Sequence, residues 1–209
     1  GGIQEGKTIN ERLAHVASHY NIPMGVGSQK VALSNKYLKE TFLIRDKFPK
    51  LFLIANIGIS EIISSNSLDI AHKVTEMIAA NALAIHLNVA QECLQPEGSR
   101  NFKGFYKSLE KISLSLKVPI LIKEVGSGIS PITAAKLKDY GVKAIDIGGK
   151  GGTSWPYIES LRSQKKYIQN LGKSMRDWGI PTAYSLALIR KNLPDIDLVA
   201  TGGIRDGLT

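Results

Sequence analysis

The sequence has almost no cysteine and no long apolar run. Its 209 residues include one cysteine, Cys93, which excludes an intramolecular disulfide and any Cys-x-x-Cys metal site. A membrane-spanning helix needs about 18 consecutive apolar residues, and because no such run occurs we expect no membrane partner. A lone thiol suits a reducing compartment, and we expect the protein to be cytoplasmic.

Acidic residues are too few to balance the basic ones. Lysine and arginine total 27 against 18 aspartate and glutamate residues, a formal net charge of +9. An excess of this kind is typical of proteins that bind nucleic acid, anionic membranes or phosphorylated small molecules. Because the cations are dispersed along the chain, the sequence favours a small phosphate-bearing ligand and predicts no nucleic acid partner.

Short apolar runs alternate with helical patterns along the whole chain. The runs cover residues 22–27, 51–58, 82–87, 118–123, 144–147 and 197–200. Their near-continuous apolar character indicates strands buried on both faces, as in a parallel sheet. The polar ends of successive strands recur about every 30 residues, the length expected for a strand with its crossover helix.

Helical patterns fill the segments between these runs. Apolar residues at helical spacing predict helices over residues 9–20 and 105–116. Thr8 and Glu11, three residues apart, form a capping-box pattern at the start of the first helix. The pair Ser130-Pro131 is typical of an N-cap followed by the first helical residue, so another helix is expected to begin there.

Two α/β architectures are compatible with this alternation, an open doubly wound sheet and a closed barrel. A dinucleotide-binding sheet requires Gly-x-Gly-x-x-Gly after its first strand, but the candidate at residues 25–30 ends in Lys30. A phosphate-binding P-loop ending at residues 172–174 fails as well, because position 167 is tyrosine. Neither motif of the open sheet is therefore present.

A barrel instead carries polar groups at the carboxyl ends of many strands. Such residues follow five of the predicted strands: Ser28, Gln29, Asn56, His86, Asn88, Lys123, Glu124 and Asp146. We therefore predict an α/β fold, a (β/α)8 TIM barrel, with residues 1–209 forming a single domain. The chain is shorter than the roughly 250 residues of a complete barrel.

Two glycine-rich segments follow predicted strands. Residues 148–153 contain four glycines, which allow close approach of a ligand to the backbone and offer amides to an anion. A flexible turn is the alternative interpretation. Residues 201–205, Thr-Gly-Gly-Ile-Arg, fit the phosphate site that barrels build after their last strands.

Four polar residues cluster at the end of the third apolar run: His86, Asn88, Gln91 and Glu92. Carboxylate and phosphate oxygens suit Mg²⁺, so Glu92 or Glu97 is a candidate metal ligand.

Lys123 lies at the end of the next apolar run and there needs an anionic partner. That partner is either a ligand or one of two nearby carboxylates, Glu124 and Asp146.

At these clusters the sequence resembles a known family. Its ordered segments are 25–29, 86–92, 95–98, 123–126, 148–153, 155–159 and 201–205. Each segment alone has little specificity for a family, but the ordered set strongly resembles the type 2 isopentenyl diphosphate isomerases, which are flavin-dependent βα barrels. The resemblance covers essentially all 209 residues.

The resemblance implies interconversion of isopentenyl and dimethylallyl diphosphate, with FMN, Mg²⁺ and NADPH as cofactors. Expected FMN contacts are Gly1, Ser28, Asn56, Lys123, Thr153, Gly203 and Arg205. Expected substrate contacts are Ser28, Lys30, His86, Asn88 and Gln91, with Glu92 holding Mg²⁺ against the diphosphate. The resemblance also implies a homo-oligomer, a tetramer or an octamer.

The implied reaction moves a double bond, so substrate and product share one oxidation state. Reduced FMN is then expected to act as an acid/base catalyst, because an unactivated alkene needs a strong, well-placed proton donor. The expected catalytic residues are His86, Gln91, Trp155 and Glu159. His86 and Gln91 are expected to orient the substrate, and Trp155 and Glu159 to line the pocket near its reacting end.

The sequence departs from the family pattern at three places. Lys30 replaces an arginine and loses its bidentate fork, and Val89 replaces a proline. The family's N-terminal basic segment and last barrel strand have no counterpart, so we expect a fragment in which residues 1–2 end strand 1 and 197–202 form strand 7.

Two other functions fit the same residues. One is another FMN-dependent TIM-barrel oxidoreductase, which needs a His or Lys base and gives no reason for a Mg²⁺ carboxylate. The other is a non-catalytic phosphate-binding barrel. The yellow spectrum of bound flavin would separate this last function from the first two.

Overall fold

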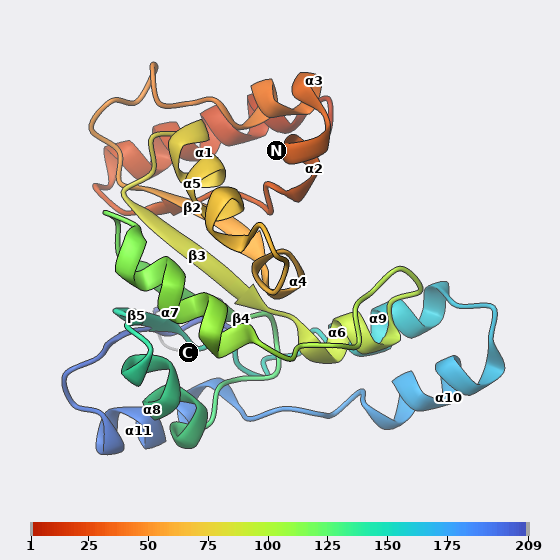
Figure 1. Ribbon diagram of the computed structural model, residues 1–209. Coiled ribbons are helices and arrows are strands. Elements are labelled where there is room, and N and C mark those ends of the chain that lie inside the picture. Colours follow the sequence, from red (N-terminus) through yellow and green to blue (C-terminus); the bar gives the residue numbers. More distant parts are fainter. Residues whose placement is uncertain (1, 208–209) are drawn as a thin grey trace. The chain divides into compact units, whose positions relative to one another are not determined.

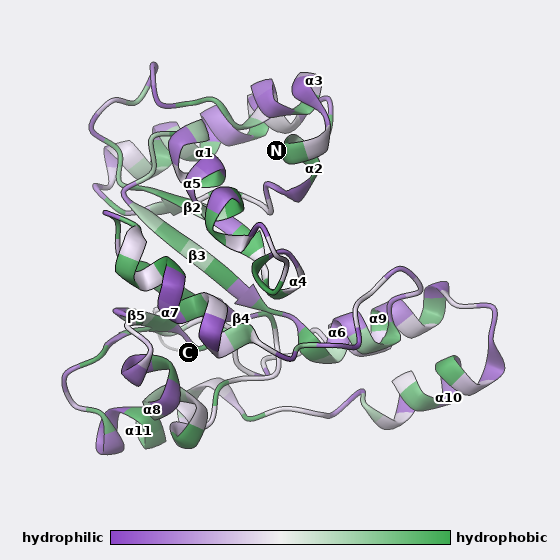
Figure 2. Cartoon of the chain, viewed as in Figure 1, coloured by the Kyte–Doolittle hydropathy of each residue, from purple (hydrophilic) through white to green (hydrophobic). Residues whose placement is uncertain are grey.

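Six strands form one parallel sheet in the computed structural model, which describes residues 2–207 (Figure 1). They are β1 (Met24–Gly25), β2 (Leu53–Gly58), β3 (Ala82–Leu87), β4 (Ile120–Glu124), β5 (Ala144–Asp146) and β6 (Asp197–Val199). The six predicted strands are thus confirmed, although β1 has two residues where six were expected. In Figure 2, β3 is hydrophobic along most of its length and hydrophilic at its carboxyl end.

The order of the strands decides between the two predicted architectures. Within the described residues every strand neighbours the next one in the chain, β1-β2-β3-β4-β5-β6. A doubly wound sheet reverses its order at a switch point, whereas a barrel adds each strand beside the last. The fold is therefore α/β of the TIM-barrel type, present as part of a barrel, as the sequence predicted.

The connections between the strands are helical. Before β3 these are α1 (Gly6–His19), α2 (Lys30–Ser34), α3 (Lys36–Lys39), the 3₁₀ turn η1 (Glu40–Phe42), α4 (Ile59–Ile62) and α5 (Ser67–Met77). After β3 they are α6 (Val89–Leu94), α7 (Phe105–Ser115), α8 (Pro131–Asp139), α9 (Trp155–Arg162), α10 (Lys166–Ser174) and α11 (Thr182–Asn192).

The contacts within the chain group into two compact units. Unit 1 is Gly1–Ile85 with Gly104–Leu121, and unit 2 is His86–Lys103 with Ile122–Thr209. The prediction of one domain over the whole chain stays a prediction.

In unit 1, β1 pairs in parallel with β2, with Met24 opposite Leu53. The helices α5 and α7 pack against one another, and α5 also packs on β2. Phe42, Leu53, Leu83 and Leu109 are fully buried in this core. The predicted helix at 105–116 is confirmed as α7.

Helix α1 buries a different face from the one that its apolar pattern indicates. Its buried residues are small or polar: Gly6, Asn10, Ala14 and Ala17. Its large apolar side chains, Ile9, Leu13, Val16 and Tyr20, are exposed. The capping-box prediction is wrong, because α1 begins before Thr8 and its N-cap, Glu5, makes no side-chain capping bond.

In unit 2, β5 pairs in parallel with β6, with Ile145 opposite Leu198. Helix α8 begins as predicted, because the Ser130 hydroxyl accepts the Thr133 amide at 3.1 Å and Pro131 follows it. Helix α9 packs against α6 and α10. Among residues 2–207, no helix has the length and apolar character that crossing a membrane requires.

Candidate functional site

Unit 1 contributes three predicted site residues, Ser28, Lys30 and Asn56, near the carboxyl ends of β1 and β2. The predicted FMN contact Gly1 lies outside the described residues. Lys30 is exposed and forms an ion pair with Glu61 at 2.7 Å, so a phosphate ligand at Lys30 would compete with this carboxylate.

A fully buried glutamine, Gln29, fixes the backbone around these residues. Its Oε1 accepts the Asn56 amide at 2.9 Å, and its Nε2 donates to the Val74 carbonyl at 2.9 Å. The Asn56 side chain in turn donates from Nδ2 to the Val26 carbonyl at 3.0 Å. Gln29 thus ties the loop after β1 to β2 and α5, and it positions its neighbours Ser28 and Lys30.

Unit 2 brings two predicted catalytic residues into direct contact. Gln91 on α6 donates from Nε2 to Glu159 Oε1 on α9 at 2.8 Å. Glu159 is buried, and its second oxygen, Oε2, accepts Arg162 Nη1 at 2.5 Å. These residues are 68 positions apart in the sequence and meet because α6 packs beside α9, as Figure 1 shows.

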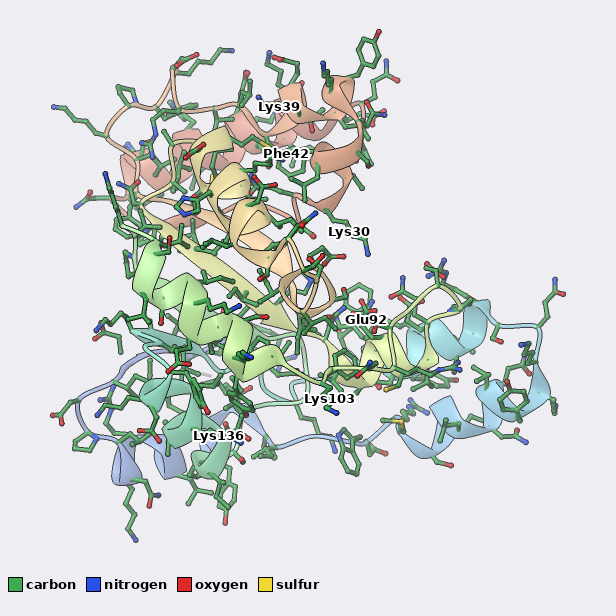
Figure 3. The ribbon with its side chains drawn as sticks, in the orientation of Figure 1. Lys30, Lys39, Phe42, Glu92, Lys103 and Lys136 are labelled. Carbon is green, nitrogen blue, oxygen red and sulfur yellow. The ribbon has the colours of Figure 1, made fainter. Side chains whose placement is uncertain are left out.

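Glu92, the predicted Mg²⁺ ligand, is also buried in unit 2 (Figure 3). Its Oε1 accepts Asn88 Nδ2 at 3.0 Å and its Oε2 accepts the Ser99 amide at 2.7 Å. Each carboxylate oxygen has a second lone pair, so these bonds orient Glu92 without exhausting its acceptor capacity. The Asn88 Oδ1 atom is buried and has no hydrogen-bond partner within residues 2–207.

The alternative metal ligand, Glu97, has a different environment. It is more than half exposed and lies 3.4 Å from Arg162 Nη2. Its Oε1 also accepts Gln95 Nε2 at 2.7 Å, and this bond, with the nearby Arg162 charge, holds the pKa of Glu97 below its ordinary value. No cluster of three metal-ligating side chains occurs in the part of the chain that the structure describes.

Lys123 and His86 are half-buried at the ends of β4 and β3. The Lys123 ammonium donates to the Glu124 main-chain carbonyl at 2.9 Å.

The Glu124 carboxylate accepts hydrogen bonds from the main chain of the loop that follows β4. Its Oε2 accepts the amides of Val125, Gly126 and Ser127 at 2.7, 3.0 and 2.7 Å. Burial raises the pKa of Glu124 above its ordinary value, because three amide hydrogen bonds offset only part of the cost of desolvating the charge.

The glycine-rich loop after β5 is largely occupied by contacts within unit 2. The Gly148 amide donates to Asp146 and Thr201, the Gly149 amide to the Thr201 carbonyl, and the Lys150 amide to the Ile180 carbonyl. A Cβ at Gly151 would overlap the Gly203 amide, so glycine is required there by packing. An anion could therefore use only the amides at the end of the loop, residues 151–153.

The remaining predicted residues of unit 2 lie at its surface. Thr153, Gly203 and Arg205 are exposed, and Trp155 is 40% exposed at the start of α9. Unit 2 therefore has two kinds of predicted site residue. Those after β5 and β6 are exposed, whereas Glu92 on α6 and Glu159 on α9 are buried and hydrogen-bonded.

Comparison with known proteins identifies several relatives of similar sequence. Proteins named isopentenyl-diphosphate delta-isomerase from Nostoc sp. (strain PCC 7120), Archaeoglobus fulgidus and Synechocystis sp. (strain PCC 6803) are 43%, 44% and 41% identical to it. Each alignment covers 100% of the chain. The chain is a homologue of the isopentenyl-diphosphate delta-isomerases. It spans 59–60% of the length of these isomerases. No protein-family model matches it.

A solved structure supports the fold alone. Inosine 5'-monophosphate dehydrogenase from Legionella pneumophila, a TIM barrel, superposes with a TM-score of 0.59 at 16% sequence identity. The superposition covers 93% of this chain and 48% of the dehydrogenase.

From the sequence, Gln29 was placed at a strand end without its partners, and two residues that contact predicted site residues, Ser99 and Arg162, were missed. A signal existed for Arg162, because a cation three residues after Glu159 shares its helix face. For Gln29 and Ser99 no local pattern reveals the partner.

Proposed function

We propose that the natural protein interconverts isopentenyl diphosphate and dimethylallyl diphosphate. The proposal rests on 41–44% identity along the whole chain to proteins of that name. The contact between Gln91 and Glu159 supports it, because this pair supplies a buried carboxylate and an amide where proton transfer needs fixed polar groups.

The reaction adds a proton at C4 of the isopentenyl group and removes one from C2. The two protons balance and no electrons are transferred. In this proposal Glu159 holds the Gln91 side chain by accepting from its Nε2 atom, which leaves Gln91 Oε1 as the acceptor facing other partners. Trp155, next to Glu159 on α9, provides an apolar ring beside the alkene.

The donor set of the chain fits FMN as the cofactor. In unit 2 the Lys123 ammonium at a strand end and the exposed Thr153, Gly203 and Arg205 are all hydrogen-bond donors, as a phosphate and the carbonyl edge of a flavin require. Ser28 and Asn56 of unit 1 are proposed as FMN contacts on the family resemblance alone. When bound and reduced, FMN would supply an acid/base group, with NADPH as its reductant.

The residues around Glu92 fit Mg²⁺. Glu92 offers a buried carboxylate, and the Asn88 Oδ1 atom has no hydrogen-bond partner within residues 2–207. Both supply oxygen ligands of the kind that a hard cation prefers. With one carboxylate, Mg²⁺ would complete its coordination with diphosphate oxygens and water. Glu92 is preferred over Glu97, whose carboxylate is paired with Arg162.

The proposed diphosphate contacts are Ser28, Lys30, His86, Asn88 and Gln91. We propose in addition that the protein is cytoplasmic and works as a homo-oligomer.

The proposal is tested by incubating the natural full-length protein with isopentenyl diphosphate, FMN, NADPH and Mg²⁺ and measuring dimethylallyl diphosphate. Gln91→Ala should lower turnover by roughly 100-fold, the size of effect that loss of an orienting group can have on a well-aligned reaction. The matched control is Gln164→Ala, which truncates an exposed glutamine of the same unit.

The two alternatives predict other results. Oxidation of a 2-hydroxy acid without isomerisation would favour an FMN-dependent oxidoreductase. A purified protein without a flavin spectrum and without turnover would favour a phosphate-binding barrel.

A further inference from the structure

Arg162 ends helix α9, one turn after Glu159. Its guanidinium donates from Nη1 to Glu159 Oε2 at 2.5 Å, and its Nη2 lies 3.4 Å from Glu97. The Glu159 side chain is 6% exposed and that of Arg162 is 54% exposed. One end of this ion pair is therefore buried and the other reaches solvent.

A carboxylate as buried as Glu159 is costly to keep charged without a cation. Arg162 forms the one ion pair that Glu159 makes within residues 2–207. The hydrogen bond and charge of Glu159 also raise the pKa of Arg162, so the guanidinium stays charged. The pair fixes the carboxylate that accepts Gln91 Nε2.

Other titratable groups come from the two helices packed against α9. They are Glu92 and Cys93 on α6, and Lys166, Tyr167 and Lys173 on α10. Glu92 is engaged by Asn88 and Ser99. None of these groups contributes a hydrogen bond or an ion pair to Glu159 within the described ranges.

Resting on the proposed function, we propose that Arg162 is a positioning residue for the isomerisation. It supplies the cation beside the buried Glu159 and orients its carboxylate, and Glu159 in turn fixes the amide of Gln91 at the reacting end of the substrate. Glu97, itself bonded to Gln95, supports the far edge of the guanidinium. The chain of contacts runs from the surface to the proposed catalytic pair.

The test uses the natural full-length protein and compares Arg162→Gln, Arg162→Lys and Arg100→Gln. Arg100 is an exposed arginine of the same unit that donates to the Cys93 carbonyl, so its variant controls for loss of a surface charge. Turnover of isopentenyl diphosphate is measured from pH 5 to pH 9. Thermal unfolding is measured over the same range.

We expect Arg162→Gln to lower kcat/KM at neutral pH by about tenfold or more and to move the acidic limb of its pH profile upward. The reason is that a buried carboxylate without a cation beside it favours its neutral form. Arg162→Lys keeps the charge but loses the two-pronged hydrogen bonding of the guanidinium. It should therefore retain part of the activity, and its pH profile should stay close to that of the wild type. Arg100→Gln should match the wild type.

Thermal unfolding gives a readout that needs no activity. Arg162→Gln leaves the buried Glu159 carboxylate without its cation, so this variant should unfold at a lower temperature than the wild type and than Arg100→Gln. A loss of activity that is equal at every pH and unrelieved by lysine would overturn the proposal. If the wild type does not isomerise the substrate, the proposed function fails, and the unfolding data alone decide whether Arg162 supports Glu159.

Discussion

Glu124 offers a sharp test of how the loop after β4 is held. We consider Glu124→Ala and Glu124→Gln, because alanine removes the carboxylate and glutamine keeps an oxygen in its place. In the wild type, Oε2 accepts three consecutive main-chain amides, those of residues 125–127. The residue is 8% exposed, so water has little access to replace it.

The size of the effect follows from these three hydrogen bonds. A buried amide left without an acceptor costs about 1 kcal/mol or more, so Glu124→Ala should lower the free energy of unfolding by about 3 kcal/mol. For a chain of this size that corresponds to a fall in Tm of about 6–12 °C. Glu124→Gln retains the acceptor and should cost less than about 1 kcal/mol.

The wild type also differs from both variants in pH dependence. Burial raises the folded-state pKa of Glu124 above its ordinary value of 4.5. The folded state therefore binds the proton more tightly than the unfolded state, and the contribution of Glu124 to stability is lost as pH rises through the folded-state pKa. Glutamine does not titrate, so this loss should be missing in Glu124→Gln.

Thermal unfolding followed by circular dichroism at a series of pH values between 4 and 8 measures both effects. Equal Tm values for Glu124→Ala and Glu124→Gln would show that the three amides find other acceptors. A wild-type protein whose stability rises, relative to Glu124→Gln, as the pH increases would refute the assigned direction of the pKa shift.

Three further predictions concern the proposed site and its support. Glu92→Gln should weaken both activity and its dependence on Mg²⁺, and an unchanged Mg²⁺ titration would move the metal to Glu97. Lys123→Ala should make bound flavin harder to reduce, because a fixed cation stabilises the anionic reduced ring; an unaltered reduction potential would rule this out. Gln29→Leu removes the hydrogen-bond partner of the Asn56 amide and of the Val74 carbonyl. It should lower the free energy of chemical unfolding by about 2–4 kcal/mol, with Gln4→Leu as an exposed control.

Strand positions were predictable because their signal is local. A buried parallel strand is apolar on both faces, so β2 to β5 could be located from their apolar runs. The residues of β6 are exposed or half-buried, although a short apolar run also marked its position. The start of α8 was also predictable, because an N-cap serine and the proline after it act on their own helix. The buried face of α1 was not, because its small residues pack inward and its large apolar residues face outward.

The candidate site divides in the same way. His86, Asn88, Gln91 and Glu92 could be grouped from the sequence, since they lie within one strand and the short helix after it. The partner of Gln91 could not, because Glu159 is 68 residues away.

The sequence by itself determined which residues form strands and which polar groups follow them, since hydrophobic periodicity and chain direction are local properties. Only the tertiary structure decided which of those groups touch. Packing of α6 against α9 joins Gln91 to Glu159, and the Thr201 segment takes up amides of the loop after β5 that an anion could otherwise bind. Hydrogen bonds between distant segments depend on the positions of whole elements, and no short stretch of sequence specifies those positions.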